Sequence, residues 1–344
     1  MVELHSALPP APPDVLDAAG SPRYGAYQGS FDRVDLSKRA SFGLLGKARQ
    51  IARLKTWHYA IVATPEVLAA FAIVDAGYAS NAFAYVVDLV GSKKLADLSF
   101  LGLPQVSADV RDRPGEGARA TFLAPGAALR ISRAQGTQAY QLEISTRHVQ
   151  LEAMLDTAAA PPSLAAIVST VGGDVDCTQK SNVLPATGML RVDDRTWSLA
   201  HGFGGLDFTR GLLPRKTAWR WAFGLGRTEE GTPVGLNVTD GLSDMAKNEN
   251  ALWIGGELVP VGPPRFTFDA KNPEGPWQVR TSDGAVDLHF APGGLHREER
   301  NLFLVKSHFV QVAGSFTGTV KDASGRAHAV EGLPGVTEDQ RVTW

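Results

Sequence analysis

The sequence predicts an all-β protein built from two antiparallel β-barrel or sandwich domains with short capping helices. Three observations support this fold class. Apolar and polar residues alternate through most of the C-terminal half, which is the period of a half-buried strand. The 36 glycines and 21 prolines interrupt the chain at intervals that suit short strands. Few segments have the apolar spacing of a helix, and large antiparallel sheets remove their exposed edges by closing or stacking.

Two segments have the pattern of antiparallel hairpins. In ALRISRAQGTQAYQLEIST, apolar residues on either side of a turn at Gly136 would face the same core: Leu129, Ile131, Tyr140, Leu142 and Ile144. The segment RNLFLVKSHFVQVAGSFTGTVKDASGRAHAV alternates in the same way and reaches a turn at DASG. The alternating segments lie on both sides of LPATG, which we interpret as a proline turn.

One segment has helical period. In FGLLGKARQIARLK an apolar face is opposed by basic residues, which predicts a helix over residues 43–54 that caps a barrel. An alternative is weak contact with a membrane surface through residues 43–54, because basic amphipathic helices bind anionic lipid.

The length of 344 residues favours two domains. We predict a disordered leader over residues 1–19, an N-terminal β-domain over 20–180 and a C-terminal β-barrel over 181–344. The two domains would meet near residues 176–190. A barrel with an apolar lining has room for a small hydrophobic ligand.

Composition excludes several function classes. The formal charge of −2 gives no long-range attraction for nucleic acid. A single cysteine, Cys177, and the lack of HExxH or CxxC spacing predict no metal site and no cofactor. No stretch approaches the roughly 20 apolar residues of a membrane span. Without a recognisable signal peptide, a cytoplasmic location is the expectation.

The stretch GGLDFTRGLLPRKTAWRWAFGLG, residues 204–226, is the strongest candidate for a site. On a strand, Asp207 points away from its two apolar neighbours, and a carboxyl inside a barrel would have a raised pKa suited to proton transfer. An ion pair of Asp207 with Arg210 or Arg215 is the alternative. Trp219 and Trp221 share one strand face, with Arg220 on the other, and form either an aromatic wall that stabilises a cation or ordinary core.

Three further clusters supply candidate ligand-binding residues. Trp57 and Tyr59 share a strand face in RLKTWHYAIVATPEVL, while Lys180 and Asn182 precede the proline turn in DCTQKSNVLPATG. Asn237 belongs to GLNVTDGLSDMAKNENALWIGGEL, a polar stretch that also contains Glu249. Its Asn, Asp and Gly residues are typical of turns, which strongly favours a loop as the alternative.

Several separated motifs resemble a bacterial family of unknown function: QKSNVLPATGMLRVDDRTWSLAHGFGGLDFTRGLLPRKTAWRWAFG, NVTDGLSDMAKNENALWIGGELVPV and SGRAHAVEGLPGVTEDQRVTW. That family is distantly similar to the carotenoid 1,2-hydratase superfamily, which includes lipocalin-like hydratases and pericyclases. The resemblance implies two lipocalin-like barrels. Asp207, Trp219 and Trp221 match its D-x-x-W-G and G-W-x-W motifs, whereas Arg210 stands where relatives carry tryptophan and Ala218 replaces a glycine.

These observations predict a cofactor-independent hydratase, lyase or isomerase acting on a mainly apolar small molecule between the two barrels. Asp207 would transfer a proton, Arg210 would bind a polar end of the substrate, and the tryptophans would line the cavity. A non-catalytic carrier of hydrophobic or lipid-like ligands is the alternative from another class, and a structural interaction role is a third.

Overall fold

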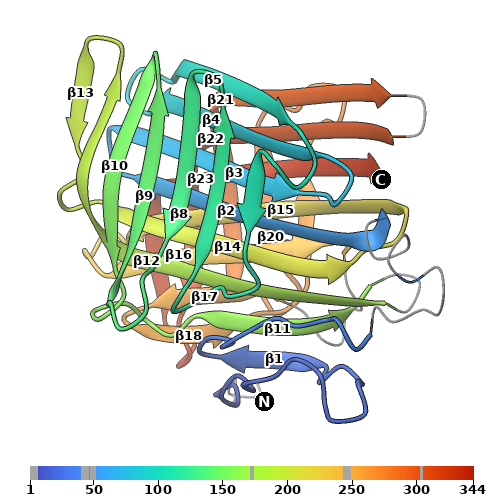
Figure 1. Cartoon of the computed structure of the whole chain (residues 1–344). Coiled ribbons are helices and arrows are strands. Elements are labelled where there is room, and N and C mark those ends of the chain that lie inside the picture. The colour runs from blue at the N-terminus through green and yellow to red at the C-terminus, as the bar shows by residue number, and fades with distance from the viewer. Residues whose placement is uncertain (1–6, 40–45, 47–51, 171–173, 243–248, 303–304) are drawn as a thin grey trace.

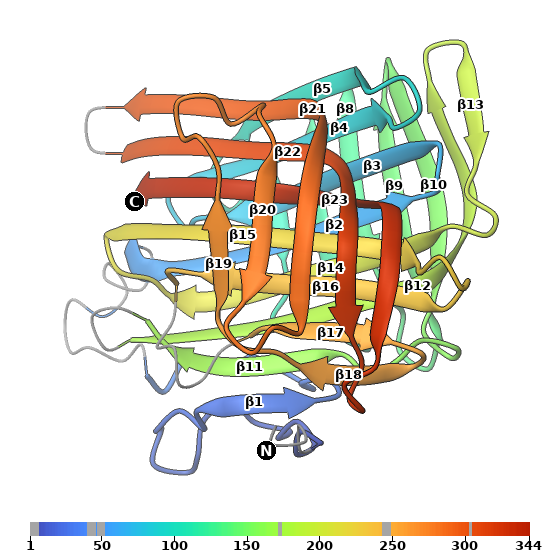
Figure 2. The same ribbon diagram turned by 180° about the vertical axis from the view of Figure 1, so that it is seen from behind.

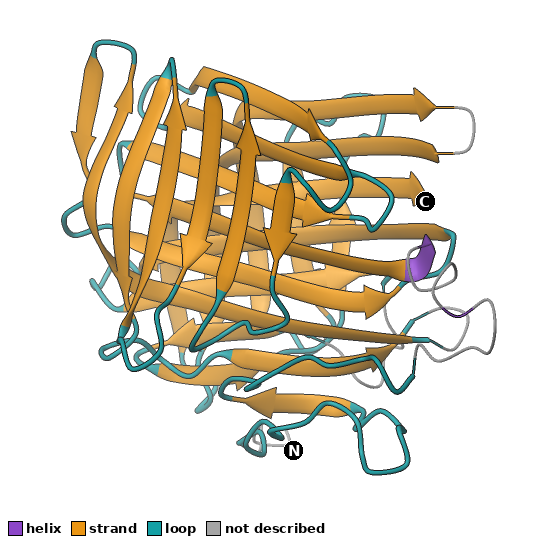
Figure 3. Ribbon diagram, in the orientation of Figure 1, coloured by secondary structure: helices purple, strands orange, loops and turns teal. Residues whose placement is uncertain are grey.

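The computed structural model describes residues 7–39, 46, 52–170, 174–242, 249–302 and 305–344, and these residues form strands and connecting loops almost throughout (Figures 1 and 3). Helical geometry is confined to three of the described residues, Gly46, Ala52 and Arg53. No helix among the described residues is long and apolar enough to cross a membrane. The predicted all-β class is therefore confirmed.

The first sheet curls into a nearly closed antiparallel barrel in which β6, at one end of the strand order, packs against β3. Its strands, in spatial order, are β5 (Lys93–Gly102), β4 (Ser80–Asp88), β3 (Val67–Asp75), β2 (Leu54–Ala63), β14 (Phe203–Leu212), β12 (Val175–Val192), β10 (Val149–Asp156), β9 (Ala139–Thr146), β8 (Ala127–Ser132), β7 (Arg119–Ala124) and β6 (Ala108–Val110). Three more strands join at the side: β1 (Gly25–Gln28), β11 (Leu164–Ser169) and β13 (Arg195–Ser198).

The second sheet is a curled half-barrel that covers one side of the first (Figure 2). Its spatial order is β18 (Glu257–Pro260), β17 (Ala251–Ile254), β16 (Pro233–Asp240), β15 (Lys216–Arg227), β23 (Ala327–Thr343), β22 (Val305–Lys321), β21 (Val286–Leu302), β20 (Trp277–Thr281) and β19 (Pro264–Thr267).

Burial follows from this arrangement of two curved sheets. Strand β10 alternates buried and exposed residues because one face packs inside the barrel and the other meets water. Strands β2, β3 and β4 are buried on both faces, since the barrel interior lies on one side and the second sheet on the other. Three apolar clusters result: one inside the barrel, one inside the half-barrel and one between the two sheets.

The path of β12 differs from the prediction. LPATG is not a turn: Leu184 and Pro185 pair with Gly204 and Phe203, so the segment continues the strand after a bulge at Ser181–Leu184. The predicted domain boundary between residues 180 and 181 falls within β12, and the chain passes from the first sheet to the second only between β14 and β15. Folding of the two sheets as separate domains stays a prediction.

The N-terminal segment also differs from the prediction. Within the predicted disordered leader, residues 7–19 are described and pack on the barrel, because Val15 and Leu16 are buried in its core and the Ala11 amide donates to the Gln28 carbonyl at 2.8 Å. The helix predicted over residues 43–54 lies mostly outside the described residues, and Leu54 already begins β2.

Candidate functional site

A cavity of about 370 Å³ lies between the two sheets. Strands β2, β3, β4, β12 and β14 form one wall, and β15, β21, β22 and β23 form the other. Most of its surface is aromatic or aliphatic, which suits a small apolar ligand. The aromatic lining residues are Trp57, Tyr59, Tyr78, Phe83, Trp219, Trp221, Phe309 and Trp344.

On the first sheet, strand pairing places three polar side chains in one row that faces the cavity. Lys180, Asp207 and Tyr59 are register partners on β12, β14 and β2. The Lys180 Nζ lies 2.6 Å from the Asp207 Oδ1, and both side chains are buried. The hydroxyl groups of Thr178 and Thr209 donate weakly to the same oxygen at 3.4 and 3.3 Å. Asp207 is therefore an ion-pair partner held between two strands.

Glu249 adds a second carboxyl to this cluster. Its Oε2 lies 3.4 Å from the Lys180 Nζ, and its side chain is only 2% exposed. Burial opposes the charge of Lys180, but the carboxylates of Asp207 and Glu249 outweigh it and raise the pKa of the lysine. Burial also raises the pKa of Glu249, because the nearby lysine compensates its charge only in part.

On the second sheet, Glu338 faces the cavity from β23. The indole N–H of Trp219 donates to its Oε1 at 2.6 Å, and the amide N–H of Gln311 donates to its Oε2 at 2.5 Å. Tyr85 in turn donates to the Gln311 Oε1 at 2.5 Å. Burial raises the pKa of Glu338 to about 7, although both hydrogen bonds favour the ionised form. A carboxyl with this pKa can give or take a proton near neutral pH.

Asp176 is a further buried carboxyl on the same face of β12 as Lys180. Its carboxyl group occupies space that the glycine at position 211 leaves free, because a Cβ added to Gly211 would lie only 2.2 Å from the Asp176 Oδ1. Neither oxygen has a hydrogen-bond partner among the described residues. Burial raises the pKa of Asp176 to about 8. Lys180 contacts Asp207 and Glu249, and its charge also acts on Asp176 and Glu338. Ionisation of all four buried carboxyls would leave net negative charge in a poorly solvated region, which is why burial raises the pKa of Asp176, Glu249 and Glu338.

The structure brings six of the predicted residues to one cavity: Trp57, Tyr59, Lys180, Asp207, Trp219 and Trp221. The rings of Trp57 and Trp219 stack at 5.9 Å, and Tyr59 packs edge-on against Trp221 at 5.2 Å. Arg220 lies on the opposite face of β15, near Asp240 and Asp339, as the two-residue period predicts.

Arg210 does not share the cavity with Asp207. The two residues are three apart on β14, so their side chains point to opposite faces, and the guanidinium donates to Thr56 at 2.9 Å on the barrel side. The prediction that Arg210 binds the polar end of a substrate in this cavity is therefore wrong.

Asn182 and Asn237 lie beside the cavity and hold its walls. Asn182 donates to the backbone carbonyls of Gly224 and Leu236, which ties the bulge of β12 to the second sheet. Asn237 accepts the indole N–H of Trp221 at 2.8 Å and donates to the Glu249 carbonyl at 2.6 Å. Neither side chain lines the cavity, and their contacts are those of supporting residues.

Sequence reasoning missed Glu338 and interpreted Glu249 as part of a loop. Among the residues that the structure describes, no group of three or more His, Cys, Asp or Glu side chains is arranged to hold a metal ion.

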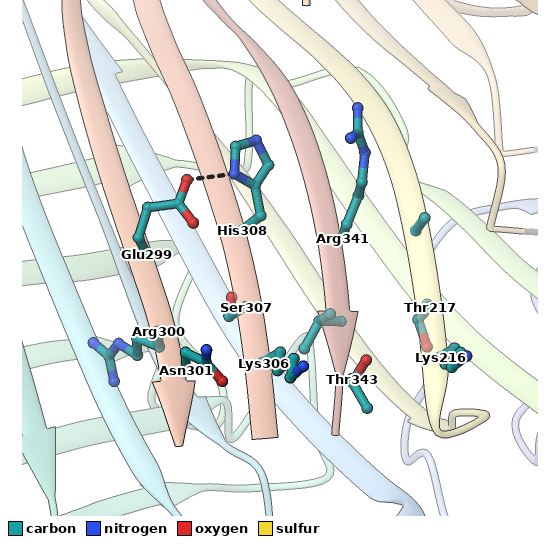
Figure 4. A pocket seen from close by; sticks show the side chains of 12 residues that line it. Lys216, Thr217, Glu299, Arg300, Asn301, Lys306, Ser307, His308, Arg341 and Thr343 are labelled. Carbon is teal, nitrogen blue, oxygen red and sulfur yellow. Dashed lines mark hydrogen bonds and ion pairs between the residues drawn. The ribbon is translucent and has the colours of Figure 1, made fainter. Parts of the chain in front are cut away.

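A second, more open pocket of about 510 Å³ lies at the ends of β15, β21, β22 and β23 (Figure 4). It is lined mainly by charged and polar side chains, among them Lys216, Lys306 and Arg341, and by a hydrogen-bonded pair, Glu299 and His308. It shares Arg300, Ser307 and Val342 with the cavity between the sheets. We take the cavity between the sheets as the candidate site, because the buried carboxyls and stacked aromatic rings face it.

Comparison with solved structures finds this fold in proteins of low sequence identity. Kievitone hydratase from Nectria haematococca matches with a TM-score of 0.50 and 11% identity over 98% of both chains. CghA, solved with Sch210972, matches with a TM-score of 0.50 and 13% identity over 85% of this chain and 89% of that one. At such identities the likeness shows the fold alone, and this fold agrees with the predicted antiparallel β architecture.

A comparison with curated protein sequences gives no match. The model of a family described as a domain of unknown function, DUF2804, matches residues 9–344, and the chain belongs to that family.

Proposed function

We propose that the protein is a cofactor-independent hydratase, lyase or isomerase that acts on a mainly apolar small molecule in the cavity between the sheets. One observation carries the proposal: Glu338, a buried carboxyl with a pKa of about 7, is held by Trp219 and Gln311 against an aromatic cavity. Such a group has the protonation equilibrium that general acid and base catalysis requires near neutral pH.

The surrounding residues suit acid and base chemistry on an apolar substrate. Glu338 would donate a proton to a double bond or remove one from an adjacent carbon. The stacked pair of Trp57 and Trp219 offers aromatic faces that stabilise positive charge developing on carbon. Lys180, neutralised by Asp207, would donate a hydrogen bond to a carbonyl or hydroxyl oxygen of the substrate.

The structural neighbours support this reading at the level of fold. One of them is named as a hydratase and another was solved with a small molecule, and each matches the fold of this chain with a TM-score of 0.50. A carrier of apolar ligands would use the same aromatic walls, but it has no need of an acid buried beside the ligand.

The test begins with native mass spectrometry of gently purified protein to identify a bound apolar metabolite. That metabolite is then incubated with the protein in water labelled with oxygen-18 and, separately, in deuterium oxide. A hydratase or hydro-lyase changes the mass by one water molecule, and an isomerase that works through proton transfer exchanges hydrogen without that change.

The variant Glu338→Gln is expected to reduce turnover by roughly 100-fold or more while ligand affinity stays within about tenfold, because only proton transfer is lost. Glu152→Gln, which removes an exposed carboxylate on β10, is the matched control. Binding of the metabolite without any turnover in the wild-type protein would favour the carrier.

A further inference from the structure

His296 lies at the edge of the cavity with its imidazole ring fixed by a carboxylate. Its Nδ1 is 2.6 Å from the Asp97 Oδ1, and its side chain is 1% exposed. The ring stacks on Phe83 at 4.6 Å and meets Phe309 edge-on at 5.6 Å, and both phenylalanines line the cavity. On β21 His296 pairs in register with Gln311, which bonds to Glu338, so the histidine belongs to the same transverse row as the proposed acid.

The bond to Asp97 determines which ring nitrogen carries the proton. Burial alone would raise the pKa of Asp97, but the hydrogen bonds from His296 and Lys94 lower it below its usual value. Asp97 is therefore ionised and can only accept, so the Nδ1 of His296 donates. In the neutral ring the Nε2 then carries a lone pair, which is the arrangement of a base oriented by a carboxylate.

The unprotonated Nε2 is a hydrogen-bond acceptor, and it faces another acceptor, the Glu298 carboxyl group. The Glu298 Oε1 is 3.9 Å away, too far for a direct hydrogen bond, and neither atom has a hydrogen-bond partner among the described residues. The other oxygen of Glu298 forms an ion pair with Arg300 at 2.8 Å. Glu298 itself lines the cavity.

Two buried acceptors facing each other at this distance need a group that donates twice. A water molecule has two O–H donors and can bond to both atoms at once, whereas a ligand hydroxyl has one and would leave the other acceptor unsatisfied. We infer that His296 and Glu298 form a water-binding site at the edge of the cavity, with Asp97 as the residue that positions the imidazole.

If the proposed function is correct, on which this step rests, the site supplies the water of a hydration. The water oxygen forms a bond to one carbon of a C=C double bond, and its proton passes to the His296 Nε2. The π electron pair takes the proton of Glu338 at the neighbouring carbon. Solvent then returns a proton from the imidazolium to the Glu338 carboxylate, so that one water molecule has been added in total.

The experiment on the water site needs no substrate. Nitrogen-15 NMR of the histidine side chains in the labelled wild-type protein, assigned through bonds from the backbone, gives the tautomer of His296. His289, an exposed residue of the same strand, serves as the internal reference. We expect a neutral ring protonated at Nδ1, and a high-resolution crystal structure with a water within about 3 Å of both Nε2 and Oε1.

A doubly protonated ring bonded directly to Glu298, or a ring protonated at Nε2, would overturn the inference. So would a crystal structure in which a ligand group other than water bridges the two atoms. Because these readouts are independent of turnover, they decide the water site even if the proposed enzyme activity fails. Once a substrate is known, His296→Gln should reduce incorporation of oxygen-18 from labelled water by roughly 100-fold, and unchanged incorporation would refute the role as base.

Discussion

Replacement of Glu338 by glutamine tests the central electrostatic claim through protein stability. The pKa of Glu338 rises from an ordinary value of 4.5 to about 7 on folding. Below pH 4.5 the carboxyl is protonated in both the folded and the unfolded protein. As the pH rises, the carboxyl of the unfolded protein ionises first. The folded protein therefore loses stability until the pH exceeds the pKa of the folded state. The wild-type protein should therefore lose roughly 2 to 3 kcal/mol from this residue between pH 5 and pH 8, at about 1.4 kcal/mol per pKa unit.

Glutamine cannot ionise, so Glu338→Gln removes this loss. The amide of the variant keeps one acceptor oxygen, so its NH2 opposes one of the two donors, Trp219 or Gln311, and this costs stability. The cost is the same at both pH values and cancels in the comparison. Urea unfolding at pH 5 and pH 8 should show the variant gaining roughly 2 to 3 kcal/mol relative to the wild type at the higher pH. Glu152→Gln should show no such gain. A pH-independent difference between Glu338→Gln and wild type would refute the raised pKa and, with it, the proposed acid.

Three further substitutions test the packing and charge of the cavity. Trp221→Ala removes a side chain that is 4% exposed and should lower the free energy of unfolding by roughly 3 to 5 kcal/mol in a urea titration. Lys180→Met should cost about 3 to 5 kcal/mol at pH 8, because it leaves buried carboxylates without their cation, and the loss should shrink at pH 5 as they take up protons. Gly205→Ala should lower the thermal midpoint through a cost of about 1 to 3 kcal/mol, because the added Cβ would lie 2.4 Å from the ring of Phe223.

Strands could be predicted from the sequence wherever one face of the sheet is buried and the other is exposed to water. The hairpin of β8 and β9 was predicted from the alternation of its two strands, and β10 alternates just as strictly. Strands β2 to β4 are nearly continuously apolar because both of their faces are buried. Such a sequence does not indicate which side chains point into the barrel and which point toward the second sheet. The proline in LPATG was also misleading, because a bulge before Pro185 lets β12 continue through it.

Some residues of the candidate site could likewise be predicted from the sequence, and others could not. Trp219 and Trp221 were placed together by the two-residue period, and the same rule separates Asp207 from Arg210, although the sequence interpretation joined them. Glu338 lies in TEDQR, a run of consecutive polar residues, so no alternation of apolar and polar residues indicates which side chains are buried. Only the pairing of β23 with β15 and β22 shows that Glu338 faces the cavity.

The site is built on paired strands, and this determines how its proton chemistry can be controlled. Lys180 and Asp207 are register partners on one sheet, and Glu338 is held by Gln311 and Trp219 on the other. The distance between these groups is therefore fixed by the packing of two sheets, including the contact that Gly205 permits, and not by the position of a loop. Burial between the sheets raises the pKa of Glu338, so a change that admits water there should restore an ordinary carboxylate and abolish the proton donor without touching any charged residue.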